Sequence, residues 1–155
     1  MITVIGEIAS EFSLKTSEGK EFAFSELNGQ WKVVFFFYRG QSAVCKRGCL
    51  SFKEQYDLFR SLEPPVEVIG ISRDSVSQHK KFKENLQLPF TLLSDPDRKV
   101  AEMFNVPTHL GIFPSKSSFV IGPDNKIHYV YDWLFRPRQH VANILSTMSS
   151  ITSES

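Results

Sequence analysis

Two short apolar runs on either side of a helical stretch limit most strongly what this chain can fold into. Residues 32–38 and residues 66–72 are each strand-sized and apolar almost throughout. Such runs are typical of strands that are buried on both faces of a parallel sheet. Neighbouring parallel strands need a crossover connection, which is usually a helix. The order strand, helix, strand therefore predicts an α/β protein.

The stretch between the two runs has the apolar spacing of an amphipathic helix. From Ser42 onwards, apolar side chains recur at intervals of four, three, four and three residues, and Pro64 and Pro65 end the pattern. These intervals place the side chains on one face of a helix, and that face is expected to pack against the sheet. The members of this apolar stripe are Cys45, Cys49, Phe52, Tyr56 and Phe59.

The remaining segments add hairpins and helices around this crossover. A parallel crossover followed by an antiparallel hairpin and a terminal helix is the thioredoxin arrangement. We therefore predict a thioredoxin-like fold, with a central mixed β-sheet flanked by helices and an N-terminal β-hairpin. The expected elements are hairpin strands at 12–15 and 21–24, a helix from the cap at Asp74 and Ser75 to about residue 85, a strand at 89–93, a helix from Asp95 to 104, a loop at 105–114, hairpin strands at 117–121 and 127–131, and a helix at 136–148.

Both cysteines of the chain lie at the start of the predicted first helix, shortly after the first apolar run. The N-terminus of a helix carries unpaired N–H groups and a partial positive charge, which favour a thiolate over a thiol. Lys46 and Arg47 follow Cys45 directly and add to this bias. Cys49 lies one helical turn further on, close enough to react with an oxidised Cys45. This arrangement predicts a redox site.

Composition and charge narrow the class of protein. A chain of 155 residues, of which 41% are hydrophobic and 23% charged, is expected to form a single globular domain over residues 1–155. A net charge of +1 disfavours nucleic acid as a partner, and no apolar run reaches the length of a membrane span. Two clustered cysteines without a visible signal sequence indicate thiols in a reducing compartment, so we expect a cytoplasmic protein.

Three segments of the chain resemble one known family. The opening IGEIASEFSL, residues 70–106 and the later stretch SSFVIGPDNKI are similar to the corresponding parts of peroxiredoxins, most closely those of the peroxiredoxin Q or bacterioferritin-comigratory group. The likeness runs over nearly all of the chain. It implies a thioredoxin-like fold and a thiol-dependent peroxidase activity, with hydrogen peroxide and organic hydroperoxides as substrates.

The resemblance also assigns roles to particular residues. The active site of the family contains a Pro-x-x-x-Thr-x-x-Cys loop and a distant arginine. By position, Cys45 is the peroxidatic cysteine, Ser42 takes the threonine place and keeps the hydroxyl, and Lys116 takes the arginine place. Lysine keeps the charge but lacks the planar fork of arginine. Tyr38 stands where the proline is expected, which is a departure from the family pattern.

The resemblance further implies a catalytic cycle. Cys45 attacks the peroxide and becomes a sulfenic acid, and Cys49 condenses with it to an intramolecular disulfide. Cys49 follows Cys45 by four residues, whereas this group usually has five. A thioredoxin- or glutaredoxin-like protein then reduces the disulfide. No cofactor or metal is implied. The chain lacks the long C-terminal arm of ring-forming relatives, so a monomer or weak homodimer is expected.

Three other interpretations compete with the peroxidase. Both cysteines lie on the apolar stripe, so they can also be inert core residues. A Cys-x-x-x-Cys pair on this fold can hold Cu(I), as in the Sco-type assembly proteins that the chain faintly resembles, with His109 as the nearby histidine. The third interpretation is a thiol sensor or binding module without peroxidase activity. The four histidines, His79, His109, His128 and His140, show no ligand spacing and are interpreted as surface or satisfied residues.

Overall fold

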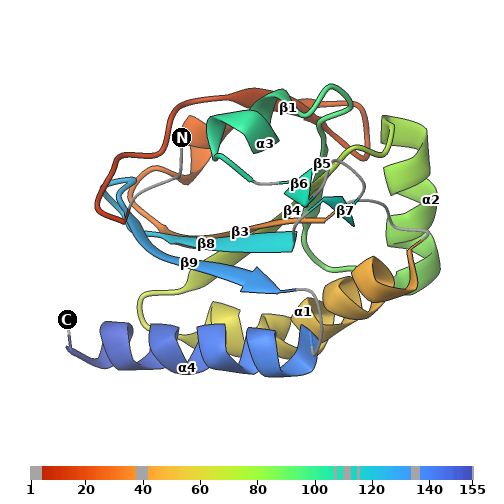
Figure 1. Ribbon diagram of the computed structural model, residues 1–155. Helices are drawn as coiled ribbons and strands as arrows, with labels where there is room; N and C mark the ends of the chain where they lie inside the picture. Colours follow the sequence, from red (N-terminus) through yellow and green to blue (C-terminus); the bar gives the residue numbers. More distant parts are fainter. Residues whose placement is uncertain are drawn as a thin grey trace.

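A seven-stranded mixed sheet forms the centre of the molecule. The computed structural model describes residues 5–37, 42–106, 108–109, 113–114, 116–133 and 137–154. Within these residues the strand order of the sheet is β2-β1-β5-β4-β3-β8-β9, and β6 and β7 pair in a separate small sheet (Figure 1). The strands are β1 (Ser13–Thr16), β2 (Glu21–Ala23), β3 (Trp31–Phe36), β4 (Val66–Ser72), β5 (Thr91–Ser94), β6 (Thr108–His109), β7 (Phe113–Pro114), β8 (Lys116–Ile121) and β9 (Ile127–Trp133).

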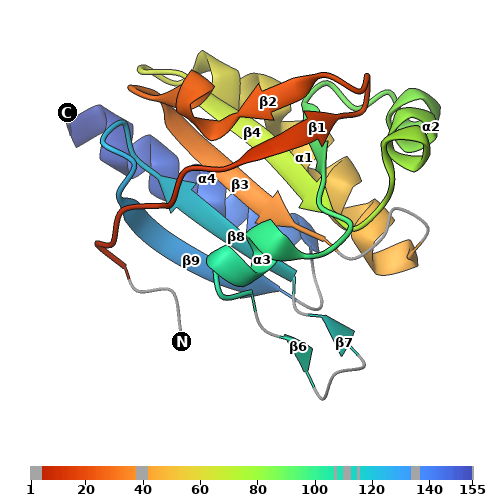
Figure 2. The ribbon, with the colours of Figure 1, turned by 90° about the horizontal axis from the view of Figure 1, so that it is seen from above.

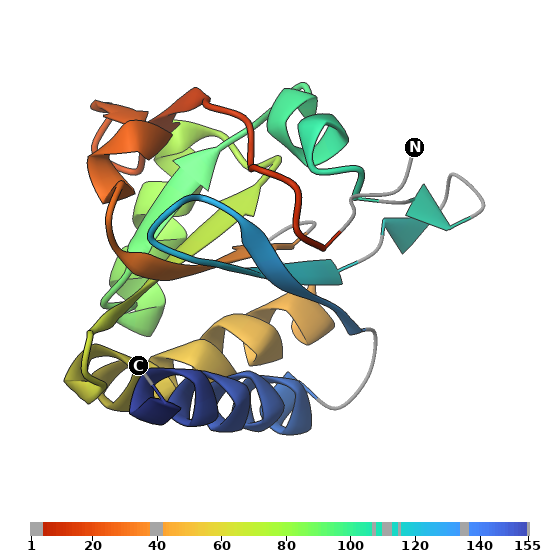
Figure 3. The ribbon, with the colours of Figure 1, turned by 90° about the vertical axis from the view of Figure 1, so that its left-hand side faces the viewer.

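Helices cover both faces of this sheet. The helices α1 and α4 run side by side on one face, whereas α3 and the short helix η1 lie on the other (Figures 1 and 3). Phe82 and Leu86 of α2 pack against the apolar cluster beneath α1, so α2 belongs to the same face as α1. The helices are η1 (Phe24–Leu27), α1 (Ala43–Ser61), α2 (Val76–Leu86), α3 (Lys99–Met103) and α4 (Pro137–Glu154).

The connection from β3 through α1 to β4 is the predicted parallel crossover. β3 and β4 pair in parallel with Val33 opposite Val68, and β4 pairs in parallel with β5. β8 lies on the other side of β3 and is antiparallel to it. Figure 2 shows β3 and β4 running in the same direction, towards the side of the molecule where α1 begins. The predicted architecture is confirmed, including the N-terminal hairpin of β1 and β2.

The central strand β3 is buried on both faces, as its sequence predicts. Val33 and Phe35 belong to an apolar cluster shared with α1 and α4. Val34 and Phe36 belong to a second cluster, on the opposite face, shared with η1 and α3. None of these four side chains is more than 3% exposed. A polar residue at any of these four positions would enter an apolar core without a partner, which explains why residues 33–36 are all apolar.

Two boundaries in the middle of the chain differ from the prediction. β5 begins at Thr91, two residues later than expected. α3 begins at Lys99 rather than directly after Asp95. The carboxylate of Asp95 accepts the N–H groups of Val100 and Ala101 at 3.2 and 3.0 Å. Arg98 is the N-cap residue of α3, so the prediction that Asp95 opens this helix is wrong. The carboxylate of Asp95 instead binds the first turn of α3 from across an intervening turn.

Two further differences concern the second half of the chain. The predicted loop at 105–114 contains the short antiparallel hairpin of β6 and β7. The last helix continues to Glu154, well past its predicted end at residue 148. The hydroxyls of Thr147 and Ser149 donate to main-chain oxygens one turn earlier, at 2.9 and 3.0 Å, so these residues are accommodated inside the helix. None of the helices in the described part of the chain is long and apolar enough to cross a membrane.

Candidate active site

The redox site predicted from the sequence lies where the chain passes from β3 to α1. Ser42 is the N-cap residue of α1, with extended backbone angles of φ −66° and ψ 131°. Its main-chain oxygen accepts the N–H of Lys46 at 2.9 Å, which closes the first turn of the helix. The Ser42 hydroxyl makes no capping hydrogen bond to the helix. The Ser42 hydroxyl, to which the prediction assigns a role in the redox site, is therefore not used to cap α1.

Cys45 and Cys49 lie on the first two turns of α1 and are directed into the protein. Both side chains are fully buried at 0% exposure, and neither forms a disulfide. They belong to the apolar cluster that contains Phe35 and Phe52, whose rings stack with their centroids 4.2 Å apart. The predicted apolar stripe of the helix is therefore confirmed, and both thiols are kept away from bulk water.

The surroundings of Cys49 favour the neutral thiol. Burial raises the pKa of Cys49 well above its ordinary value, because a thiolate is poorly solvated inside an apolar cluster. The neighbouring Cys45 and the carboxylate of Asp74 raise the pKa of Cys49 further. A thiol is a weaker nucleophile than a thiolate, so these surroundings suit Cys49 to the second step of a two-cysteine reaction.

Asp74 belongs to a buried polar cluster that the sequence reasoning missed. Asp74 lies just after the end of β4. The end of β4 lies beside the end of β3, since the N–H of Phe37 donates to the main-chain oxygen of Ile71 at 3.0 Å. The N–H of Asp74 donates to the hydroxyl of Ser72 at 3.2 Å, and the hydroxyl of Ser94 donates to the main-chain oxygen of Asp74 at 2.6 Å. Asp74 is thereby fixed, only 8% exposed, at the edge of the sheet where α1 begins.

His79 of α2 completes this polar cluster. Its Nε2 lies 2.6 Å from the hydroxyl of Ser72, and its ring centroid lies 6.1 Å from that of Phe37. Among the described residues Nδ1 has no hydrogen-bond partner, although the side chain is 0% exposed. Burial lowers the pKa of His79 to about 4, while Asp74 acts in the opposite direction. His79 is therefore not a surface residue, and the prediction of a satisfied histidine holds for Nε2 but not for Nδ1.

Lys116 is the first residue of β8, and the strand register brings its backbone to the same edge of the sheet. Continuing the antiparallel register of β3 and β8 sets Lys116 opposite Phe37, the residue that follows β3. The side chains of Lys116 and His109, and the whole of Tyr38, lie outside the described residues. The roles expected for these three residues therefore stay predictions.

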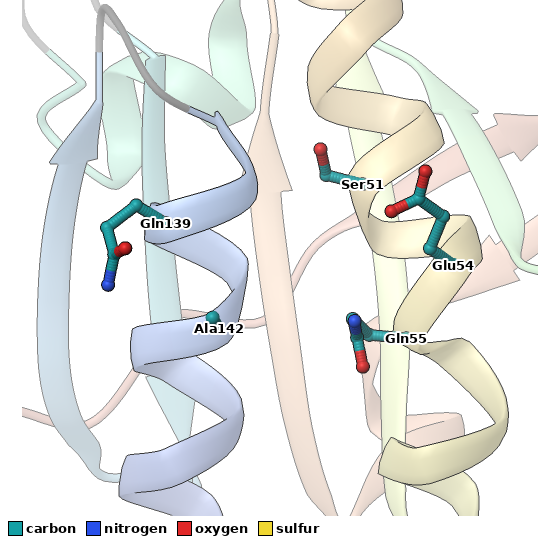
Figure 4. Close-up of a pocket in the computed structure, with 5 residues that line it drawn as sticks. All are labelled: Ser51, Glu54, Gln55, Gln139 and Ala142. Carbon is teal, nitrogen blue, oxygen red and sulfur yellow. The ribbon is translucent and has the colours of Figure 1, made fainter.

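A groove of about 400 Å³ separates α1 from α4 on the outer side of the cysteine-bearing helix (Figure 4). Its lining is polar or small and includes neither thiol. Within the described residues, no three His, Cys, Asp or Glu side chains are grouped so that they could hold a metal ion. The residues that line the groove are Ser51, Glu54, Gln55, Gln139 and Ala142.

Comparison with known sequences relates the chain to one family. Residues 5–130 match the AhpC/TSA family. The chloroplastic peroxiredoxin Q of Oryza sativa subsp. japonica is 33% identical over 147 residues, which cover 94% of this chain and 67% of the relative. The chloroplastic peroxiredoxin Q of Suaeda salsa is also 33% identical, over 94% of this chain and 68% of the relative.

Solved structures show the same fold. The peroxidoxin BcpB of Mycobacterium tuberculosis has a TM-score of 0.86 to this chain at 28% identity, covering 97% of this chain and 99% of that one. A mutant of PrxQ from Xylella fastidiosa has a TM-score of 0.87 at 23% identity, covering 97% and 98%. Together with the mixed sheet and the β3–α1–β4 crossover, these likenesses confirm the predicted thioredoxin-like fold. The chain therefore belongs to the AhpC/TSA family, as a peroxiredoxin of the peroxiredoxin Q and bacterioferritin-comigratory type.

Proposed function

We propose that the protein is a thiol-dependent peroxidase in which Cys45 reduces hydrogen peroxide and organic hydroperoxides and Cys49 resolves the product as an intramolecular disulfide. One observation carries the proposal. Two buried thiols lie on the first two turns of α1, at the carboxyl edge of the sheet, in a chain of the AhpC/TSA family. Because the chain belongs to this family, a redox role explains the two cysteines at the start of α1 better than an inert role in the core does.

In the first step, the thiolate of Cys45 attacks one oxygen of the peroxide. The O–O bond breaks, the sulfur becomes a sulfenic acid, and the other oxygen leaves as water or an alcohol after it takes up a proton. The first N–H groups of α1 have no acceptor within the helix, so they favour negative charge on the sulfur and on the departing oxygen. We assign the positioning of the peroxide to Ser42 and Lys116.

In the second step, Cys49 attacks the sulfenic sulfur of Cys45. The S–S bond forms, and the hydroxyl leaves as water with the proton of the Cys49 thiol. A disulfide requires Cα atoms roughly 4.4–6.8 Å apart and converging side chains, whereas side chains one turn apart on an intact helix run parallel. We therefore expect the first turns of α1 to loosen during the reaction. Gly48, a poor helix former, lies between the two cysteines and eases this change.

Reduction of the disulfide completes the cycle. A dithiol protein of the thioredoxin or glutaredoxin kind attacks the disulfide, carries away two electrons and leaves both cysteines as thiols. We further propose that the protein works in a reducing compartment such as the cytoplasm, as a monomer or weak homodimer. Sedimentation at several protein concentrations, with the protein fully reduced and fully oxidised, measures the oligomeric state.

Stopped-flow peroxide consumption by three proteins tests the proposal. The wild type is expected to lose both thiols for each equivalent of peroxide, and mass spectrometry should place the new bond between Cys45 and Cys49. The variant Cys45→Ser should not consume peroxide. The variant Cys49→Ser should react once and stop at a sulfenic acid that a dimedone probe labels on Cys45.

Three outcomes would overturn this function. Fast consumption by Cys45→Ser would assign the chemistry to another group. A wild type whose thiols are indifferent to peroxide would leave a sensor or binding module. Copper that co-purifies with the reduced protein and is lost in both cysteine variants would instead support a metal-binding role.

A further inference from the structure

We propose that His79 is a proton-binding switch of the redox site. Its ring is kept from water while the first turns of α1 are closed, and it takes up a proton when the Cys45–Cys49 disulfide loosens those turns. This inference rests on the proposed function, because it needs that disulfide. The disulfide can also be formed by thiol exchange without peroxide, so a failure of the peroxidase and a failure of the switch can be told apart.

A series of ring contacts connects His79 to the cysteine-bearing helix. The ring of His79 packs beside that of Phe37, with the centroids 6.1 Å apart. Phe37 stacks on Phe35 at 5.8 Å, and Phe35 stacks on Phe52 of α1 at 4.2 Å. These three phenylalanines belong to the apolar cluster that contains both thiols. Phe37 also lies five residues before Ser42, so the segment that leads into α1 starts beside the histidine ring. A movement of the first turns of α1 therefore disturbs the cover of His79.

The hydrogen bonds of His79 leave one ring nitrogen that water could satisfy. Nε2 lies 2.6 Å from the hydroxyl of Ser72, and this hydroxyl also accepts the N–H of Asp74. We assign the hydroxyl hydrogen to a bond with Nε2, which places the hydrogen of the neutral ring on Nδ1. Among the described residues Nδ1 has no hydrogen-bond partner, and the side chain is 0% exposed. Because a buried donor without an acceptor is costly, the ring favours any form of the protein in which water reaches it.

Burial outweighs the charged surroundings of the ring. The carboxylate of Asp74, which follows β4, raises the pKa of His79, but burial has the larger effect and lowers the pKa to about 4. From β3 the ring meets Phe37, which is apolar. Loss of burial therefore restores most of the ordinary proton affinity of the ring. The other ionisable side chains on the adjoining parts of the elements around it are Arg73 after β4, Lys83 of α2, Asp95 after β5, and Cys45, Cys49 and Lys53 of α1.

Proton uptake by His79 couples the redox state of the two cysteines to pH. In the closed dithiol form the ring binds a proton only near pH 4, whereas a hydrated ring binds it near the ordinary value of 6.5. Acid favours the form that binds protons more tightly. Acidification from about pH 7.5 to about 5.5 should therefore favour the disulfide form by about tenfold. More of the protein is then held oxidised, where it depends on its reductant.

Exchange with reduced and oxidised dithiothreitol at these two pH values tests the switch. Two electrons and two protons pass from one dithiol to the other as one disulfide breaks and another forms, and mass spectrometry counts the thiols that remain in the protein. Thiol ionisation is common to the wild type and His79→Gln and cancels in the ratio of their equilibrium constants. Because glutamine takes up no proton, this ratio should rise about tenfold in favour of the wild-type disulfide at the lower pH. The variant His128→Gln replaces a half-buried histidine that packs on Trp31, at the start of β3, and should behave as the wild type.

A rise of the ratio smaller than about threefold overturns the inference, whether or not the protein consumes peroxide. A second measurement needs no variant and keeps the inference testable should His79→Gln fail to fold. NMR titration follows the ring signals of His79, assigned through their proximity to Phe37, in the dithiol and disulfide forms of the wild type. The midpoint should lie near pH 4 in the dithiol form and closer to 6.5 in the disulfide form. Equal midpoints in the two forms would show that the ring does not respond to the redox state.

Discussion

The Nε2 atom of His79 lies 2.6 Å from the Oγ atom of Ser72, in the interior between α2 and the carboxyl end of β4. This contact joins α2 to the sheet at the edge where α1 begins. It is a polar contact in largely apolar surroundings, so its contribution to stability depends strongly on the protonation state of the ring.

Acid is expected to destabilise the protein through His79. Burial lowers the pKa of His79 from 6.5 to about 4 in the folded state, whereas the unfolded chain keeps the ordinary value. Between these values the unfolded chain binds a proton that the folded protein does not. The stabilising contribution is therefore complete above pH 6.5 and is lost as the pH falls towards 4. The loss amounts to at most about 3 kcal/mol.

Urea unfolding of the wild type and His79→Gln across this pH range measures the effect. Glutamine keeps a polar side chain at this position but does not titrate, so the free energy of unfolding of the variant should depend less steeply on pH. Carboxylates that titrate in the same range are common to both proteins and cancel in the difference. Equal slopes for the two proteins would contradict the prediction.

The buried Lys32 is expected to be structural. Its ammonium group donates to the main-chain oxygens of Leu27 and Gly122 at 3.2 Å each and to the side-chain oxygen of Asn125, and it lies 5.2 Å from the ring centroid of Phe24. Lys32→Met should lower the free energy of unfolding by about 2–4 kcal/mol, because it leaves buried acceptors without donors. Chemical denaturation measures this loss. The exposed Lys20→Met serves as the control and should change stability by less than about 0.5 kcal/mol.

Gly70 of β4 is expected to tolerate no side chain. A Cβ atom at this position would lie 2.7 Å from Cζ of Phe35 and 2.9 Å from Cδ2 of Leu92. Gly70→Ala should therefore lower the free energy of unfolding by about 1–3 kcal/mol, because the added methyl group overpacks the core. The double variant Gly70→Ala/Phe35→Leu removes the ring that clashes, so its loss should be smaller than the sum of the two single losses. If the loss of stability in the double variant equalled the sum of the two single losses, the ring of Phe35 would not be the group that clashes with the added methyl group.

Asp95 is expected to stabilise the start of α3. Its carboxylate accepts two main-chain N–H groups of that helix, and the side chain is only 3% exposed. Asp95→Ala should lower the free energy of unfolding by about 1–2 kcal/mol, as the loss of a helix cap does. Asp97→Ala, an exposed carboxylate two residues further on, is the matched control. Similar losses in the two variants would argue against the capping role.

The crossover and the cysteine-bearing helix could be predicted from the sequence because their signals are local. The apolar run 66–72 coincides with β4, and Ser42, from which the helical spacing was expected to begin, is the N-cap residue of α1. Both thiols were expected on the buried face of that helix, and they are found there. Periodicity and capping residues carry this information within a few neighbouring residues.

The polar cluster around Asp74 could not be predicted, because it depends on contacts between distant elements. Ser72 and Ser94 meet only through the parallel register of β4 and β5, and His79 reaches Ser72 only because α2 folds back against the sheet. A serine at the end of a buried strand and an aspartate two residues later, with a histidine on the next helix, are the signal that could have indicated it. The small hairpin of β6 and β7 carries no clear periodicity at all.

The complete burial of Cys45 and Cys49 has a consequence for the proposed disulfide between them. If the two sulfurs are drawn together as proposed, we expect part of α1 to move away from the cluster that contains Phe35 and Phe52. The oxidised form would then expose apolar area that the reduced form covers. Reduction by a dithiol donor would restore that burial, and the recovered burial would favour the return to the reduced state.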